Sequence, residues 1–123
     1  MANCPAETRR KSRTLINSRG IPWRQWPQTQ EAGIYIIKQG RWVIYVGRTG
    51  NLNQRPRAHC YGEQAIDIHI ADTADSRLSY NYVVDPDQRR NERCYIHHIT
   101  ELQGRRPRFN IKEGDACAQC ERR

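Results

Sequence analysis

The sequence predicts one small α/β domain of the α+β type, in which antiparallel strands and helices share a single core. Three observations support this prediction. The chain has 123 residues, enough for one hydrophobic core but too few for two full domains. Two runs of β-branched and aromatic residues lie on either side of a Gln-Gly pair, as in a β-hairpin. A third, alternating run leads directly into a segment with the residues that begin a helix.

Composition divides the chain into three segments. Residues 1–30 are polar, basic and interrupted by Pro22 and Pro27, so we expect an N-terminal arm outside the core. Its Trp23 and Trp26 either pack on the domain, which we favour, or stack on exposed bases. Residues 31–112 carry the apolar periodicity of the predicted domain, and residues 113–123 form a C-terminal tail.

The first predicted element of the domain is a β-hairpin. Residues 34–37 and 42–46 have the β-branched and aromatic content of strands, and the glycine between them suits a tight turn. Side chains project from defined faces of a strand, and a hairpin brings residues of its two strands together. We therefore expect the phenols of Tyr35 and Tyr45 to share one site.

A helix is predicted in residues 49–60, after the second strand. Arg55 and His59 lie one helical turn apart in this segment, so their side chains should be neighbours. Pro56 conflicts with a regular helix, because a proline beyond the first turn removes a backbone donor and clashes with the preceding turn. Either the helix begins late or its first turn is distorted.

Residues 66–84 contain two alternating apolar segments. Residues 78–84 predict a strand. The run of isoleucines at residues 66–70 fits an edge strand and part of a helix equally well.

A longer helix is predicted to begin at Asp85. This residue is a good N-cap, a proline follows it at the first helical position, and Gln88 completes the capping-box spacing. The helix should end at residues 102–103, because Gly104 is a typical C-terminal stop.

Glu92 stands out on this helix because it lies on the apolar stripe. The stripe is made of Tyr95, Ile96, Ile99 and Leu102. A carboxylate on a face that packs against the core needs a partner, since burying it unpaired is costly. That partner is either one of the many arginines or a metal ion.

The charge of the chain points to a polyanionic partner. The net charge is +8, and of 21 basic residues only Lys11, Lys38 and Lys112 are lysines. Arginine presents a planar fork of donors that pairs with phosphate oxygens. A genome rich in Arg codons would give the same bias, so charge alone indicates only weak nucleic-acid binding. No apolar stretch is long enough to span a membrane.

Five cysteines, with no export signal at the N-terminus, argue for reduced thiols and an intracellular protein. Cys117 and Cys120 have the spacing of half a zinc site. A structural zinc site needs four ligands, and no second pair with suitable spacing follows. Zinc at Cys117 and Cys120 is therefore not favoured, although Cys60 or His59 offers a further ligand.

Several of these residues form an ordered set. They stand in the order Gly33-Ile34-Tyr35, Tyr45-Val46-Gly47, Arg55, Glu92 and Asn110. Each tripeptide alone is a weak signal, but the whole set, over residues 33–110, resembles the GIY-YIG endonuclease superfamily. The resemblance implies a three-stranded antiparallel sheet flanked by helices, in agreement with the elements predicted above.

The resemblance also implies roles for individual residues. Tyr35 and Tyr45 match the two motif tyrosines, Arg55 matches the family arginine, and Asn110 matches an asparagine near the site. Glu92 matches the metal-binding glutamate, and His59 matches a histidine found in part of the family. Two features depart from the pattern. The nine residues between the tripeptides are slightly few, and Pro56 disturbs the helix that should position Arg55.

These residue types suit phosphodiester hydrolysis, which needs an activated water and cations to neutralise developing charge. One Mg²⁺ or Mn²⁺ ion held by Glu92 is expected, because Mg²⁺ keeps several waters and needs few carboxylates. A phenol titrates near ~10 in water, so Tyr35 can act as a base only if neighbouring cations lower its pKa. Tyr45 or His59 is expected to assist Tyr35, and Arg55 to bind the scissile phosphate.

DNA is the expected partner, contacted by Arg48 and by the further basic residues Lys38, Arg41 and Arg57. One site cuts one strand, so cleavage of both strands requires a homodimer or two successive visits. Two alternatives remain: a non-catalytic nucleic-acid-binding module of the same fold, and a zinc-dependent interaction module built on Cys117 and Cys120.

Overall fold

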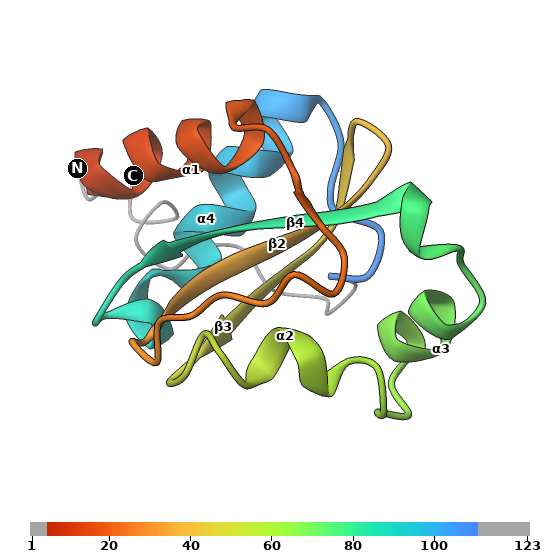
Figure 1. Ribbon diagram of the computed structural model, residues 1–123. Helices are drawn as coiled ribbons and strands as arrows, with labels where there is room; N and C mark the ends of the chain where they lie inside the picture. Colours follow the sequence, from red (N-terminus) through yellow and green to blue (C-terminus); the bar gives the residue numbers. More distant parts are fainter. Residues whose placement is uncertain (1–4, 111–123) are drawn as a thin grey trace.

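The computed structural model describes residues 5–110, which form one antiparallel sheet with helices on both faces (Figure 1). The strands are β1 (Ile21–Pro22), β2 (Gly33–Gln39), β3 (Trp42–Thr49) and β4 (Leu78–Val84), in the spatial order β1-β4-β2-β3. The predicted α+β class is confirmed, and β2, β3 and β4 are the three expected strands. The fourth, β1, has two residues, too few to leave a pattern in the sequence.

The expected hairpin is present as β2 and β3. Gly40 lies in the turn with a φ of +60°, a conformation that favours glycine. The register places Tyr35 opposite Gly47, and a bulge follows the pair formed by Ile37 and Tyr45. Because β4 covers the other side of β2, β3 is an edge strand of the sheet.

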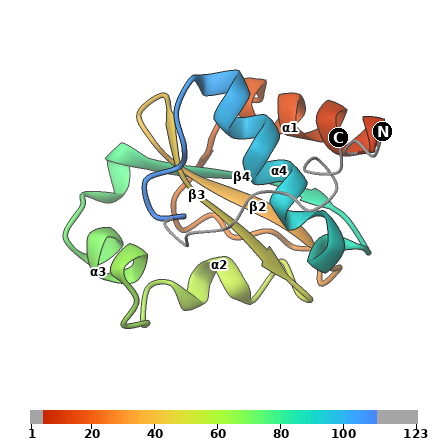
Figure 2. The same ribbon diagram turned by 180° about the vertical axis from the view of Figure 1, so that it is seen from behind.

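Helices α1 (Ala6–Asn17) and α4 (Gln88–Gln103) cover one face of the sheet (Figure 2). The core between them and the sheet consists of Leu15, Ile34, Ile36, Val43, Val46, Tyr95, Ile96 and Ile99. Gly104 ends α4 in the left-handed conformation, as predicted. Leu102 departs from the predicted stripe, because it is 44% exposed.

The expectation of an N-terminal arm is wrong for residues 6–17, which form α1 and pack against α4. The buried residues of α1 are Thr8, Ser12 and Leu15. The Ser12 hydroxyl donates to the Thr8 carbonyl at 2.8 Å, so a polar side chain is satisfied within the helix and can be buried. A packing face made of small polar residues leaves no apolar stripe in the sequence.

The opposite face of the sheet carries α2 (Arg55–Ala58) and α3 (Ala65–Ala71). The core on this side consists of Trp23, Tyr35, Ile37, Ile44, Leu52, Ile66, Ile70, Leu78 and Tyr80. Trp23 and Trp26 pack edge to face with ring centroids 4.9 Å apart, which agrees with packing on the domain. Residues 66–70 lie in α3 and are helical, which is one of the two alternatives that the sequence left open. A short 3₁₀ helix, η1 (Asp75–Arg77), leads into β4.

Asp85 holds the start of α4 without being its N-cap, because the helix begins at Gln88 and its N-cap is Asp87. The buried Asp85 carboxylate accepts hydrogen bonds from the Asp87 amide at 2.8 Å and from the Tyr95 hydroxyl at 2.8 Å. The prediction that Asp85 is the N-cap is thus wrong: a short turn separates Asp85 from the helix, and its carboxylate accepts a hydrogen bond from the Asp87 amide within that turn.

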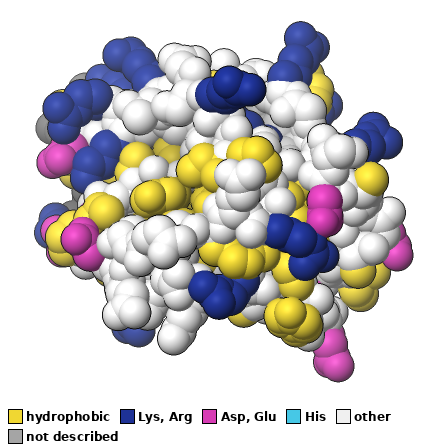
Figure 3. Space-filling view, in the orientation of Figure 1, with side chains coloured by type: hydrophobic (Ala, Val, Ile, Leu, Met, Phe, Trp, Pro, Cys, Tyr) yellow, Lys and Arg dark blue, Asp and Glu magenta, His cyan; other side chains and the backbone are white. Residues whose placement is uncertain are grey.

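The surface is basic but its charges are dispersed. On the face shown in Figure 3, Lys and Arg side chains are scattered, many of them at the margin, while hydrophobic side chains gather nearer the middle. Within residues 5–110, every helix is too short or too polar to cross a membrane.

His98 is buried on α4, where α1 packs. Burial, together with the nearby His97 and Arg9, lowers the pKa of His98 to about 4. An unfolded histidine titrates near ~6.5, so the neutral imidazole stabilises the fold fully above that pH. We expect the free energy of unfolding to fall by about 1–3 kcal/mol as the pH drops from about 6.5 to about 4.

Urea unfolding across this pH range measures the effect. Part of the decrease should disappear in His98→Gln and persist in His97→Gln, whose side chain is 30% exposed. An unchanged pH dependence in His98→Gln would contradict the assignment.

Candidate active site

Tyr35, Tyr45 and His59 meet at the edge of the sheet formed by β3. The ring centroid of His59 lies 5.7 Å from that of Tyr35 and 5.4 Å from that of Tyr45, and the two phenol rings are 6.2 Å apart. The Tyr35 hydroxyl lies 2.6 Å from His59 Nε2. The hairpin and the segment after it therefore bring the two expected phenols and the expected imidazole together.

Asp67, which the sequence analysis missed, completes this arrangement. Its Oδ1 lies 2.5 Å from His59 Nδ1, and both side chains are buried. Its Oδ2 accepts a hydrogen bond from the Gln64 amide at 3.0 Å, which fixes the carboxylate at the start of α3. The sequence did contain a signal for this carboxylate, because Asp67 lies between two isoleucines. Glu92 stands out in the same way, on an apolar stripe. Both carboxylates require partners.

The short helix α2 positions His59 and Arg55. Asn51 Oδ1 accepts from the Asn53 amide at 3.0 Å, which forms the turn before the helix. The helix begins only at Arg55, with Pro56 in its first turn. The late start proposed from the sequence is thus correct, and it removes the conflict with proline because first-turn amides have no helical partner.

Gly47 allows Tyr35 to lie against β3. A Cβ atom at Gly47 would overlap the Tyr35 hydroxyl and Cζ atoms. We expect Gly47→Ala to lower the free energy of unfolding by about 1–3 kcal/mol, because a buried ring must shift in a packed core. Gly50→Ala, with open space around the added methyl, should leave stability unchanged. Urea denaturation of both variants is the measurement, and equal stabilities would contradict this packing.

Burial is the main influence on the two phenols. It raises the pKa of Tyr35 well above its ordinary value, and Tyr45 adds to the increase. The Arg55 guanidinium acts in the other direction, through its charge and a hydrogen bond to Tyr35. Burial likewise raises the pKa of Tyr45, and the Arg55 charge again opposes the shift. Both phenols are therefore protonated at neutral pH.

His59 is neutral at the same pH. Burial lowers its pKa, and the hydrogen bond to Asp67 only partly offsets this shift. A neutral imidazole has one N–H donor and one acceptor nitrogen. The carboxylate at Nδ1 favours the proton on that nitrogen, so Nε2 accepts the hydrogen bond from Tyr35.

Glu92 lies on α4 close enough to affect both phenols, since its charge raises the pKa of Tyr35 and of Tyr45. Its side chain is 28% exposed, and Oε1 lies 3.4 Å from Arg48 Nε. Of the two partners that the sequence left open, the structure thus shows an arginine. The carboxylate also fits a metal ion, because a partly exposed oxygen ligand suits Mg²⁺ with its retained waters.

Asn110 has a structural contact beside the site. Its Oδ1 accepts from the Val46 amide at 2.7 Å and its Nδ2 donates to the Val46 carbonyl at 2.9 Å. The side chain therefore pairs with the exposed edge of β3 as a further strand would. Asn110 lies next to Tyr45 in this way and holds the strand that carries it.

Among the four basic residues expected to contact DNA, Lys38 does not fit. Its side chain is buried, and Nζ donates to the carbonyls of Ile16 at 2.9 Å and Ser18 at 3.3 Å. That prediction is wrong, because strand alternation turns Lys38 towards the end of α1. Arg41 and Arg57 are exposed, and Arg57 donates to the Asn53 carbonyl at 3.0 Å.

Two expectations fall outside the described residues. These are the pair Cys117 and Cys120, at which zinc was not favoured, and the tail of residues 113–123. Within residues 5–110, the potential metal ligands that gather in a group of three or more are His97, His98 and Glu101. They belong to α4, and Arg9 and Arg13 of α1 lower the pKa of His98 there, a positive environment that disfavours a cation.

Comparison with known proteins found no matching protein-family model and no matching curated protein. Among solved structures, the chain is similar to the GIY-YIG N-terminal endonuclease domain of UvrC from Thermotoga maritima. The form bound to magnesium is 20% identical with a TM-score of 0.46, covering 87% of this chain and 99% of that chain. An asparagine-to-alanine variant is 19% identical with a TM-score of 0.47, covering 88% and 99%.

These identities and TM-scores are low, so the assignment of the fold rests on the residues of this chain. Both tyrosines and the arginine of the ordered set surround one site together with His59, and the charge of Glu92 acts on the tyrosines. The sheet and its flanking helices are those that the resemblance implied. The chain thus has a GIY-YIG-like α+β fold, with the ordered motif residues around a single site.

Proposed function

We propose that this chain is a metal-dependent DNA endonuclease that hydrolyses phosphodiester bonds at a single active site. The observation that carries the proposal is the buried series of hydrogen bonds from Tyr35 through His59 to Asp67, next to Arg55 and Glu92. A buried phenol linked to a neutral imidazole and a carboxylate is an arrangement for moving a proton.

Tyr35 would act as the base through His59. As the phenol oxygen takes a proton from the attacking water, it gives its own proton to His59 Nε2. The resulting imidazolium is stabilised by the Asp67 carboxylate at Nδ1. In this way Tyr35 need not become a free phenolate, which its burial disfavours. Tyr45, whose ring lies beside both groups, would orient the water at the edge of β3.

Arg55 would bind the phosphate that is cut. A guanidinium pairs with two phosphate oxygens and keeps its charge at every relevant pH. The same charge favours loss of the Tyr35 proton, since it lowers the pKa of that phenol. Arg48 would contact a neighbouring phosphate once Glu92 has another partner.

Glu92 would hold one Mg²⁺ or Mn²⁺ ion. When bound, the ion would supply positive charge to the phosphate and to the leaving oxygen. Binding the ion requires Glu92 to exchange its contact with Arg48, which is partly exposed and therefore weak. One such site cuts one strand, so we propose a homodimer, or two successive binding events, for cleavage of both strands.

The test of this function is conversion of supercoiled plasmid to nicked circles by the wild-type chain in Mg²⁺, in Mn²⁺ and in chelator. Metal-dependent nicking would support the endonuclease, and the ratio of nicked to linear product would show whether one strand or both are cut.

Asp67→Asn separates the proposed proton path from simple packing. The amide can donate to Nδ1, which places the imidazole proton on Nε2 and removes the acceptor for Tyr35. We expect about 10²-fold slower nicking with unchanged DNA affinity. Because Asp67 raises the pKa of His59, the acid limb of the pH–rate profile should move to lower pH. Asp72→Asn, at the exposed C-terminal end of α3, is the control. Wild-type rates in Asp67→Asn would contradict the path.

A second function is favoured by one observation, the ion pair between Glu92 and Arg48. In a non-catalytic DNA-binding module of the same fold, this pair would persist and no metal would bind. Salt-sensitive DNA binding without cleavage in either metal would support that module.

A further inference from the structure

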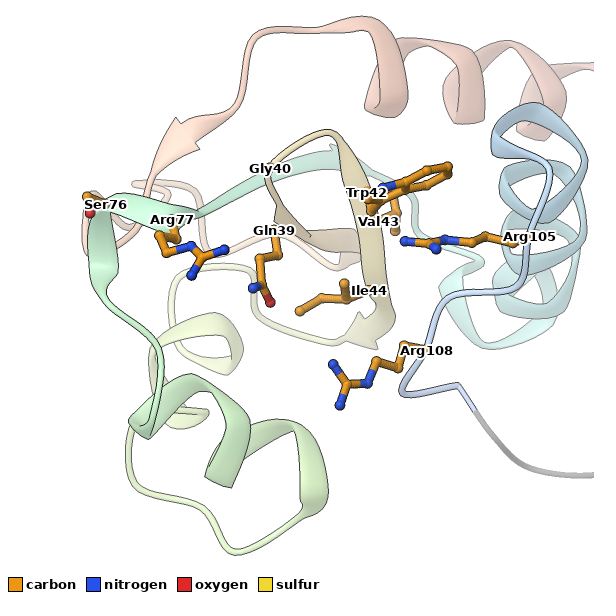
Figure 4. A pocket seen from close by; sticks show the side chains of 9 residues that line it. All are labelled: Gln39, Gly40, Trp42, Val43, Ile44, Ser76, Arg77, Arg105 and Arg108. Carbon is orange, nitrogen blue, oxygen red and sulfur yellow. The ribbon is translucent and has the colours of Figure 1, made fainter.

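A second feature of the molecule lies at the end of β3 that follows the β2–β3 turn. It is a pocket of about 640 Å³ at the turn between β2 and β3 (Figure 4). Arginines from two separate segments reach its walls: Arg77 from η1, and Arg105 and Arg108 from the segment after α4. Trp42, Val43 and Ile44 of β3 form a further wall.

In the part of the chain that the structure describes, the three guanidiniums have no acidic partners. Among residues 5–110, no Asp or Glu lines the pocket, and none of Arg77, Arg105 and Arg108 forms an ion pair with a carboxylate. Like charges gathered around one cavity give it a positive potential that attracts anions. The cations of this pocket therefore point to a ligand with negative charge.

The pocket also has an aromatic and apolar side. The Arg105 guanidinium carbon lies 3.6 Å from the centroid of the Trp42 ring, so the cation lies over the face of the indole. A guanidinium plane held on an aromatic ring presents its other face to a further flat ring. Val43 and Ile44 are buried hydrophobic residues at the same wall. A ligand with phosphates and a flat ring matches both sides.

We propose that this pocket binds an unpaired nucleotide of the DNA strand that the active site cuts. Arg77 and Arg108 would contact its phosphates, and its base would lie against the Arg105 and Trp42 stack. A base within a duplex is stacked on its neighbours and cannot enter a pocket. The inference rests on the proposed nuclease function and names the substrate class, a strand with unpaired nucleotides beside the cut.

The position of the pocket supports this substrate. Trp42 and Arg48 stand six positions apart on β3, about 20 Å at the usual rise of a strand. Figure 1 shows the β2–β3 turn and the end of β3 on opposite sides of the molecule. One strand several nucleotides long can therefore reach both sites, with edge strand β3 between them.

The experiment measures binding in chelator, so that no cleavage is needed. The probe is a labelled single-stranded oligothymidylate, and its affinity is measured over a range of salt concentrations. Arg77→Gln/Arg108→Gln is compared with Arg9→Gln/Arg10→Gln, which removes the same charge from α1, away from the β2–β3 turn (Figure 1). The salt slope is the steepness with which the logarithm of the affinity falls as the logarithm of the salt concentration rises. We expect the pocket variant to lower this steepness by about 1.4, and the α1 variant to leave it unchanged.

Three further probes identify the ligand. An abasic strand with the same phosphates should bind the wild type about fivefold more weakly or worse, a difference that Arg105→Gln should abolish. A fully paired duplex should show no difference in salt slope between the two double variants. Thymidine monophosphate should compete only weakly, because it lacks neighbouring phosphates.

Equal salt slopes for the two double variants would overturn the proposal, as would equal affinity for the abasic strand or tight binding of the monophosphate. Because every measurement is made without metal, loss of the nuclease function would show separately, in the plasmid assay.

Discussion

Tyr35→Phe should abolish metal-dependent nicking while leaving DNA binding intact. The variant removes the one oxygen that links the attacking water to His59, so we expect the rate to fall by about 10³-fold. It also leaves the buried His59 Nε2 without its hydrogen bond, which should cost about 1–3 kcal/mol of stability. The measurements are plasmid nicking in Mg²⁺, DNA affinity in chelator and urea unfolding.

Tyr95→Phe is the matched control for this experiment. Tyr95 is also a fully buried phenol, and its hydroxyl donates to Asp85 at 2.8 Å on the opposite face of the sheet. It should lose stability to a similar extent and keep its nicking activity. A Tyr35→Phe protein that nicks as fast as the Tyr95→Phe protein would show that Tyr35 is a packing residue.

Glu92→Gln should slow nicking as much as Tyr35→Phe does, and it should also change how the nicking rate depends on the metal concentration. The amide keeps the shape of the side chain but loses the charge that would attract the cation, so nicking should fall by about 10³-fold in Mg²⁺. Folding should be unaffected, because the ion pair with Arg48 is partly exposed. Nicking rates over a series of Mg²⁺ and Mn²⁺ concentrations measure the effect.

Glu101→Gln removes a carboxylate from the same helix and serves as control. Glu101 is exposed, with Oε1 3.1 Å from His97 Nε2. We expect wild-type metal dependence from this variant. If Glu92→Gln instead keeps the wild-type dependence and Glu101→Gln loses it, the metal site lies on the His97 and Glu101 side of α4.

Much of the fold could be predicted from the sequence because local signals agree with the tertiary structure. Strands 33–39, 42–49 and 78–84 were visible as β-branched or alternating runs separated by turn residues. The end of α4 was marked by Gly104. In contrast, α1 was missed because its packing face includes Thr8 and Ser12, whose hydroxyls bond to the backbone.

The site was predictable as a set of residues but not as a geometry. Tyr35, Tyr45, Arg55 and Glu92 followed from motif order, and Glu92 also from its place on an apolar stripe. Asp67 was missed because its partner His59 is reached through a loop, although the unexplained carboxylate was present in the sequence. The role of Asn110 was open as well, since only the folded chain places its amide on the edge of β3.

The sequence by itself determined the three longer strands of the sheet, the hairpin that brings the two tyrosines to one site, and the residue types needed there. These depend on alternation, turn residues and motif order, which are local properties of the chain. Only the tertiary structure decided which face each polar group occupies. It buried Lys38 against α1, joined His59 to Asp67, and gathered Arg77, Arg105 and Arg108 around one pocket. Such contacts join residues from separate elements, and their energies depend on burial and distance, which no local pattern encodes.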